Sequence, residues 1–249
     1  MALPSISTPT YEAVVPSTGE TVQFRPFLVK EEKILLIAVE SKDKKAQIRA
    51  LKQILKNCIQ SKTNINSLAM YDIEYLFIQI RGKAVGEILE PVVVCPQCSV
   101  SGKLKIDLSS ISVNTNTRKE TPYKVMVSDK IGMTFVYPVM EMVENLNIEK
   151  TSSGVQTDTE AVFRIIASCI DTIFDEEKVF NPKDYSEKEI MQFLENIPSE
   201  PFRRIVEFIS SMPRVEKIVH FKCPNCQFEK DMVLRGIEDF FGSVSPTIA

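Results

Sequence analysis

The sequence of 249 residues has little of what catalytic sites are commonly built from. It contains one histidine, His220, and eight glycines. It also lacks the Gly-x-Ser-x-Gly, P-loop and Gly-x-Gly-x-x-Gly patterns that present a nucleophile or cradle a phosphate. General acid–base catalysis is poorly supported, because histidine is its most frequent carrier. We therefore predict that the protein is not an enzyme.

Long apolar runs and a secretion signal are also lacking. The longest plainly apolar runs, such as residues 34–39, are far shorter than the roughly 18 residues that a membrane span requires. The first residues lack the basic start and apolar stretch of a signal peptide. The net charge of -3 gives no general attraction to polyanions. We expect a cytosolic protein without a membrane span, in which nucleic-acid binding would need a local basic patch.

The sequence does contain two matching cysteine motifs, each with proline at the same inner position and apolar, extended flanks. They are Cys95-Pro96-Gln97-Cys98 and Cys223-Pro224-Asn225-Cys226. Such turns are typical of zinc knuckles between strands, and two of them complete the four-thiolate shell that structural zinc prefers. We predict one structural Zn²⁺ held by Cys95, Cys98, Cys223 and Cys226. A redox dithiol or a buried apolar pair remains an alternative for either motif.

The separation of the motifs predicts a long-range clip. A self-contained zinc ribbon has roughly 15 to 20 residues between its pairs, whereas Cys98 and Cys223 are far more distant in the sequence. Loop closure becomes costlier only logarithmically with length, and structural zinc contributes roughly 10 to 16 kcal/mol in small zinc peptides. The other cysteines, Cys58 and Cys169, lie on apolar helical stripes and are expected to be buried. His220 is expected in the strand before the second knuckle, in the core or beside the metal ligands.

Apolar periodicity predicts an α+β fold that is mainly helical. Residues 1–20 are expected to form an extended arm, and Asp43 is a candidate helix cap. Capping boxes are expected at Thr157/Glu160 and Ser186/Glu189. Helices are expected near residues 30–40, 44–59, 68–89, 138–145, 157–173, 186–194, 199–209 and 237–241. Strands are expected at 21–25, 123–127 and 133–137 and on both sides of each knuckle.

The element order predicts an internal duplication. Asn57-Cys58-Ile59 corresponds to Ser168-Cys169-Ile170, and each segment follows a proline, Pro26 or Pro138, at nearly the same distance. We predict two similar halves of strand, helices and strand-knuckle-strand, joined by the split zinc-ribbon-like site. Residues 1–112 would form the first half and 113–249 the second, within one compact unit and with a polar connector at 112–122. The alternative is two unrelated helical segments with the same generic spacing.

Two groups of basic residues indicate possible binding surfaces. One helix carries Lys44, Lys45, Arg49, Lys52 and Lys56 opposite its apolar stripe, which indicates a solvated face or a surface for an acidic partner. Lysines near the thiolates are Lys103, Lys105, Lys222 and Lys230. They would offset the charge of a four-thiolate zinc site, or they would contact nucleic acid as in other zinc ribbons.

Several short motifs carry a resemblance to a known family. They are the segments 16–19, 24–33 (FRPFLVKEEK), 38–41 (AVES), 71–77 (YDIEYLF) and 81–87 (RGKAVGE). The sequence resembles the T4-type phage baseplate protein family, most densely over about residues 14–100.

The resemblance implies a late viral protein that acts in the host cytoplasm during tail assembly. Its partners would be baseplate hub proteins, bound through protein surfaces, with no small-molecule substrate. A non-enzymatic assembly factor, a permanent hub subunit and a zinc-ribbon nucleic-acid binder remain open as readings. The helix around Tyr71 to Arg81 and the N-terminal arm are the candidate contact surfaces.

Overall fold

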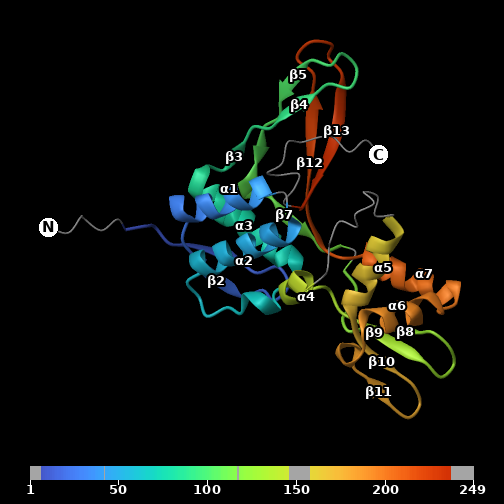
Figure 1. Ribbon diagram of the computed structural model, residues 1–249. Helices are drawn as coiled ribbons and strands as arrows, with labels where there is room; N and C mark the ends of the chain where they lie inside the picture. The colour runs from blue at the N-terminus through green and yellow to red at the C-terminus, as the bar shows by residue number, and fades with distance from the viewer. Residues whose placement is uncertain (1–6, 42, 117, 146–157, 237–249) are drawn as a thin grey trace. The chain divides into compact units, whose positions relative to one another are not determined.

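The computed structural model describes residues 7–41, 43–116, 118–145 and 158–236, which form a mixed α+β structure (Figure 1). The chain divides into two units. Unit 1 joins the residues up to Asn114 with those from Arg214 onward, and unit 2 is Thr115–Pro213. This division differs from the expected halves 1–112 and 113–249, because the second knuckle lies in unit 1.

Unit 1 combines three helices with short antiparallel strands. None of the helices that the structure describes in either unit has the length and apolar composition needed to cross a membrane. The elements of unit 1 are β1 (Tyr11–Val14), β2 (Thr21–Phe24), α1 (Val29–Ser41), α2 (Lys44–Cys58), η1 (Ile65–Ser67), α3 (Met70–Val85), β3 (Ile88–Leu89), β4 (Val92–Val94), β5 (Ser101–Lys103), β6 (Ile106–Asp107), η2 (Leu108–Ser110), β7 (Ser112–Asn114), β12 (Arg214–Lys222) and β13 (Glu229–Arg235).

The predicted helix boundaries are mostly confirmed in this unit. Asp43 caps α2, since its side chain accepts a hydrogen bond from the Lys45 N–H at 2.9 Å. The third helix ends earlier than expected, at Val85, because Gly86 adopts a φ of 131° that only glycine takes readily. The chain then continues as a strand at Ile88.

The expected N-terminal arm is wrong for the residues that the structure describes from Tyr11 onward. These residues form β1, which pairs antiparallel with β2. The turn between the two strands is anchored to α3, since the Ser17 N–H donates to the Asp72 carboxylate at 2.8 Å. Asp72 is buried and also accepts from the Ala69 N–H at the start of α3.

The expected polar connector at 112–122 begins with a strand. Residues 112–114 form β7, which pairs with Arg214–Glu216 at the start of β12. The three-stranded sheet β13-β12-β7 therefore brings the C-terminal hairpin back onto unit 1. Val215, Phe221 and Leu234 of this sheet share one core with Ile78 of α3. This burial explains why the second knuckle joins unit 1.

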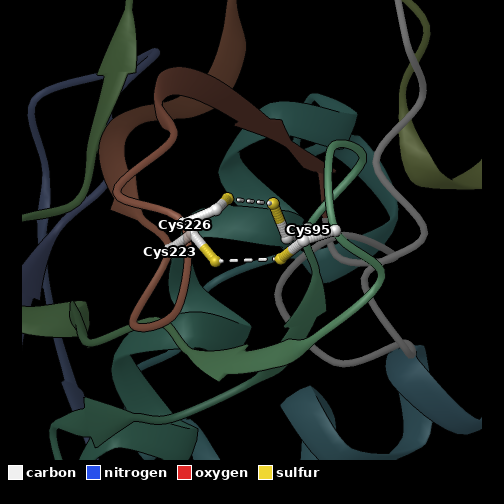
Figure 2. Close-up of side chains that lie close together, drawn as sticks. Cys95, Cys223 and Cys226 are labelled. Carbon is white, nitrogen blue, oxygen red and sulfur yellow. Dashed lines mark hydrogen bonds between the residues drawn. The ribbon is translucent and has the colours of Figure 1, made fainter.

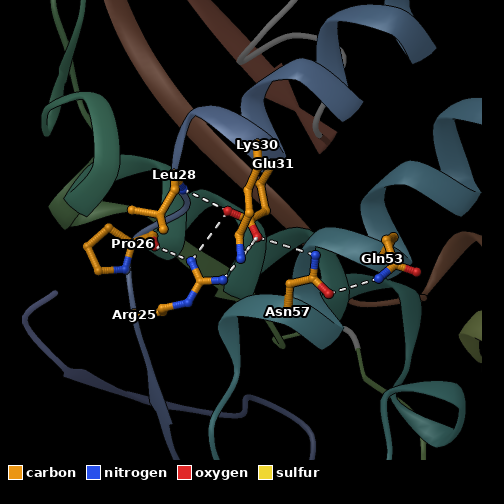
Figure 3. Close-up of polar contacts among 7 residues, drawn as sticks. All are labelled: Arg25, Pro26, Leu28, Lys30, Glu31, Gln53 and Asn57. Carbon is orange, nitrogen blue, oxygen red and sulfur yellow. Dashed lines mark hydrogen bonds and ion pairs between the residues drawn. The ribbon is translucent and has the colours of Figure 1, made fainter. Parts of the chain in front are cut away.

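A buried ion pair fixes the side of α1 that faces the protein (Figure 3). Glu31 is fully buried and accepts from Arg25 Nη2 at 3.0 Å, from the Leu28 N–H at 2.9 Å and from Asn57 Nδ2 at 3.3 Å. Arg25 in turn donates to the carbonyl oxygen of Pro26 at 2.9 Å. Lys30 of α1 also lies 3.6 Å from this carboxylate, but the three hydrogen-bond donors come from the β2–α1 connection and from α2, so these contacts hold α1 against its neighbours.

Unit 2 contains a four-stranded antiparallel sheet in the order β11-β10-β9-β8 and four helices among the described residues. The Ser186/Glu189 capping box is confirmed at the start of α6. Thr157, the cap of the other expected box, and the expected final helix at 237–241 lie outside the described residues. The elements are β8 (Tyr123–Met126), β9 (Gly132–Phe135), α4 (Met140–Asn145), α5 (Asp158–Cys169), β10 (Ile170–Phe174), β11 (Val179–Phe180), η3 (Pro182–Asp184), α6 (Glu187–Glu195) and α7 (Ser199–Ser210).

Aromatic rings form the centre of unit 2. Phe208 of α7 is fully buried, and it stacks on Tyr123 at 5.0 Å and on Tyr137 at 5.1 Å between ring centroids. Phe135 lies 6.0 Å away in a tilted arrangement. The Tyr137 hydroxyl accepts from the Lys119 N–H at 2.8 Å, so the polar end of the ring has a partner.

The two units repeat the same local contacts after their first hairpins. In unit 1 the Arg25 N–H donates to the carbonyl oxygen of Cys58 at 3.0 Å, and in unit 2 the Val136 N–H donates to that of Cys169 at 2.8 Å. The residue after each cysteine pairs with the phenylalanine that ends the hairpin, as Phe24 with Ile59 and Phe135 with Ile170. Downstream, an asparagine caps a 3₁₀ turn in each unit, Asn64 before η1 and Asn181 before η3.

Candidate metal centre

The first cysteine pair lies in the turn between β4 and β5. Cys95 follows β4 directly, and its N–H donates to the Val100 carbonyl oxygen at 3.0 Å, while the Ser99 N–H donates to the Cys95 carbonyl oxygen at 2.9 Å. Ser99 has a φ of 59°, the left-handed conformation that reverses the chain after Cys98. This turn presents both thiols on the same side.

The second pair repeats this geometry between β12 and β13. The Cys223 N–H donates to the Phe228 carbonyl oxygen at 2.8 Å, and Gln227 has a φ of 60°. Gln227 follows Cys226 as Ser99 follows Cys98. Because hydrogen bond and left-handed residue occupy equivalent positions, the two turns are the same local structure formed twice.

The four sulfur atoms converge in unit 1 (Figure 2). All four lie within 4.8 Å of one another. The Sγ atoms of Cys95 and Cys226 are 3.7 Å apart, and those of Cys98 and Cys223 are 3.5 Å apart. A tetrahedral zinc site with Zn–S bonds of about 2.3 Å has sulfur–sulfur edges of about 3.8 Å. The sulfur positions therefore fit one tetrahedral ion, and zinc suits a shell of four thiolates.

The electrostatics of the cluster also favour a cation. The Val100 N–H and the Asn225 side chain, with smaller contributions from neighbouring thiols, lower the pKa of Cys98 to about 6. The Phe228 N–H likewise favours the thiolate of Cys226, but burial and the surrounding thiols raise the pKa of Cys226 to about 12. One thiol of the cluster therefore ionises readily while another resists, as expected where several negative charges would crowd together. A divalent ion removes this penalty by neutralising the sulfurs.

The two turns meet because their strands share a core. Cys95 and Cys223 are buried in the same cluster as Ile78 of α3 and Phe221 of β12. Gly102 of β5 allows the close approach, since a Cβ atom at this position would lie 3.1 Å from both the Phe221 ring and Pro224. The packing of these side chains therefore brings the sulfur atoms together.

All four cysteines predicted as ligands are brought together, and the other two lie elsewhere. Cys58 and Cys169 are fully buried at the ends of α2 and α5. Burial raises the pKa of Cys58 to about 11 and that of Cys169 to about 12, so both remain inert thiols. Sequence reasoning missed the thiolate donors Val100 and Phe228, although each stands two positions after the second cysteine of its motif.

His220 lies in β12, the strand before the second knuckle, as expected, but it is not in the core. Its side chain is 57% exposed, and Nδ1 lies 2.8 Å from the Asp231 carboxylate of the paired strand β13. Lys103 and Lys105 both lie near Glu90, at 3.6 and 3.7 Å, and Lys222 pairs with Glu229 at 2.6 Å. These lysines have carboxylate partners, which weakens the case for a basic nucleic-acid patch at the knuckles.

The predicted contact surface around Tyr71 to Arg81 is buried on its apolar side. This stretch belongs to α3, where Ile73, Phe77 and Ile80 are among the half of the residues that are buried. A helix that forms the core of its unit cannot present these side chains to another protein. The sequence motif there is explained by packing.

Comparisons with known proteins agree over most of the chain. The family model described as T4 bacteriophage base plate protein matches residues 8–242. The baseplate hub assembly protein gp26 of Enterobacteria phage T4 is 22% identical over 223 residues, which cover 90% of this chain and 93% of that protein. No solved structure gives a significant match.

Proposed function

Because the chain belongs to the T4 bacteriophage base plate protein family, we propose that it is a non-enzymatic factor for assembly of the baseplate hub. The observation that carries this proposal is the similarity to a hub assembly protein along nearly the full length of both chains. Its partners are then baseplate hub proteins of the same phage, which it meets in the host cytoplasm during tail assembly.

The role proposed for the cysteine cluster is structural. With zinc bound by Cys95, Cys98, Cys223 and Cys226, the two knuckles are joined and unit 1 is closed between chain segments 125 positions apart. Four thiolates fill the tetrahedral shell, so this ion has no open position for a substrate. A protein of this kind acts through the shape of its surface.

We also propose that the two units descend from one duplicated segment. The support is the paired set of contacts: the same backbone hydrogen bond to the carbonyl of Cys58 or Cys169, the same strand bridge after it, and an asparagine-capped 3₁₀ turn further on. Each copy contributes one cysteine pair. The pair of the second copy, Cys223 and Cys226, follows unit 2 in the sequence but packs in unit 1. The zinc site thus combines both copies.

The alternative within the same family is a permanent subunit of the baseplate. The two roles differ in what remains after assembly. An affinity-tagged chain expressed during infection should capture hub proteins from lysates, while immunoblots of purified virions should show far less than one copy per hub. Stoichiometric retention in virions would establish the permanent subunit instead. Absence from both captured hub complexes and virions would refute a baseplate role.

A metal-site variant connects the proposal to the structure. Cys95→Ser should lose zinc and hub capture together, whereas Cys58→Ala changes a buried cysteine outside the cluster and should keep both. Complementation of a phage that lacks the gene provides the readout, as plaques formed per infected cell. A Cys95→Ser variant that complements normally would exclude the structural role of the ion.

A further inference from the structure

Helix α1 carries apolar side chains on more sides than its own unit covers. The run from Ile34 to Val39 is uninterrupted, so it extends around the helix. Of the whole helix only Glu31 and Ala38 are buried. An apolar run that extends around a helix is normally covered by other protein segments. Leu36 and Ile37 are instead 56% and 57% exposed, and Val29 is 79% exposed.

The exposed side is a defined stripe. Positions 29, 33, 36, 37 and 40 are spaced by three, four and seven residues, which places them on one face of a helix. We call Val29, Lys33, Leu36, Ile37 and Glu40 the α1 stripe. By the same spacing rule the stripe lies opposite Glu31, whose buried contacts hold the other side of α1 (Figure 3). The stripe therefore points away from the core of unit 1.

The charges within the stripe match those of a second, reversed copy. Lys33 and Glu40 are both exposed and stand at equal distances on either side of the point between Leu36 and Ile37. An antiparallel partner related by a twofold axis at that point places Lys33 opposite Glu40 twice, and Leu36 opposite Ile37 twice. A twofold interface requires this kind of self-complementarity. In such a dimer the opposite charges would pair, and the apolar side chains beside them would be buried.

We propose that the α1 stripe is a homodimer interface, in which α1 pairs antiparallel with α1 of a second copy of this chain. The proposal does not depend on the baseplate role. It commits to a second copy because the stripe complements itself in charge and in apolar content about a single point.

The first test is the oligomeric state of the full chain by sedimentation equilibrium between about 1 and 100 μM, a range in which a dimer with a micromolar or lower Kd is well populated. The wild type should dimerise, and Leu36→Asp should be monomeric with unchanged circular dichroism, because Leu36 is mostly exposed. Val179→Asp in β11 is the matched control, since Val179 is 72% exposed and lies in unit 2. A wild type that is monomeric throughout overturns the proposal, and so does a Leu36→Asp dimer.

The second test reads the register. Lys33→Glu and Glu40→Lys each place like charges together twice in a homodimer, so each variant alone should associate about tenfold more weakly or worse. An equimolar mixture of the two variants restores both opposite-charge contacts, and the mixed dimer should recover wild-type affinity. If the mixture stays as weak as its components, the antiparallel pairing is wrong. A third outcome is that the wild type and Leu36→Asp are both monomeric but only the wild type captures hub proteins. In that case the α1 stripe binds a hub protein, and the dimer is overturned.

Discussion

Units 1 and 2 begin with the same hairpin and helix contacts but complete their cores by different means. Unit 2 buries Phe208 between two tyrosine rings, so one large side chain fills its centre. Unit 1 instead brings together two small hairpins, of which β4–β5 has only three residues in each strand. Isolated two-stranded hairpins are marginal in water. Unit 1 also buries aromatic rings, namely Phe24, Phe77 and Phe221, but it additionally gathers four cysteine sulfurs between its hairpins. The comparison teaches that the proposed zinc would clip together hairpins of a kind that unit 2 does not need.

Metal removal should produce the largest difference between the units. In Cys95→Ser, or after strong chelation, the zinc-binding energy is lost, which in small zinc peptides is roughly 10 kcal/mol or more. Hydrogen exchange followed by mass spectrometry should show loss of protection in β4, β5, β12 and β13, and retained protection in β8 to β10. Cys58→Ala should keep one zinc per chain. Unchanged protection and thermal stability in Cys95→Ser would contradict the clip.

The converse change affects the aromatic core. Phe208→Ala should destabilise unit 2 by about 4 kcal/mol, because it removes a fully buried ring and leaves a cavity. Zinc content should stay at the wild-type value, since the cysteines are in unit 1. Phe202→Ala in the same helix is the control and should cost less, because Phe202 is only partly buried. Equal effects of the two variants would argue against the stacked core.

The buried carboxylate of unit 1 predicts a pH dependence. Burial favours the neutral form of Glu31, but hydrogen bonds from Arg25 and the Leu28 N–H outweigh it and hold the pKa of Glu31 below its ordinary 4.5. The lowered pKa means that the stabilising contribution is complete above pH 4.5 and is lost as pH falls through the folded-state value.

Glu31→Gln should therefore cost about 3 kcal/mol at pH 7, since it removes one partner of a buried ion pair. The difference from the wild type in urea unfolding should shrink below pH 4.5. Glu32→Gln, which changes the exposed neighbouring residue, should have little effect at either pH. A deficit for Glu31→Gln that stays constant down to pH 3 would show that folding does not lower the pKa of Glu31.

Two glycines in unit 1 predict small effects of opposite sign. Gly102→Ala pushes a methyl group against Phe221 and Pro224 and should cost about 1 to 2 kcal/mol, with weaker zinc retention in a chelator competition. Gly82 lies inside α3, where an added Cβ would meet Leu108 at an ordinary 3.8 Å. Gly82→Ala should stabilise by about 0.5 to 1 kcal/mol through helix propensity. A Gly102→Ala variant as stable as the wild type would mean that the two hairpins do not approach closely at Gly102.

The sequence alone determined the features that depend on neighbouring residues. The Cys-x-x-Cys turns, the Asp43 cap, the Ser186/Glu189 box and most helix boundaries follow from short-range hydrogen bonding and apolar periodicity. The four candidate ligands could be named for the same reason, because each motif specifies its own turn. The family resemblance rested on motifs whose structural meaning is local, such as the Arg25 and Glu31 contacts that hold α1.

Only the tertiary structure decided where those local pieces belong. The pairing of β12 with β7 assigned the second knuckle to unit 1, and the burial of α3 converted an expected contact helix into core. The exposure of His220 and the exposed stripe on α1 were decided in the same way. A strand pairing or a buried face depends on residues far away in the chain, and neither periodicity nor motif spacing carries information about which distant surface arrives to cover it.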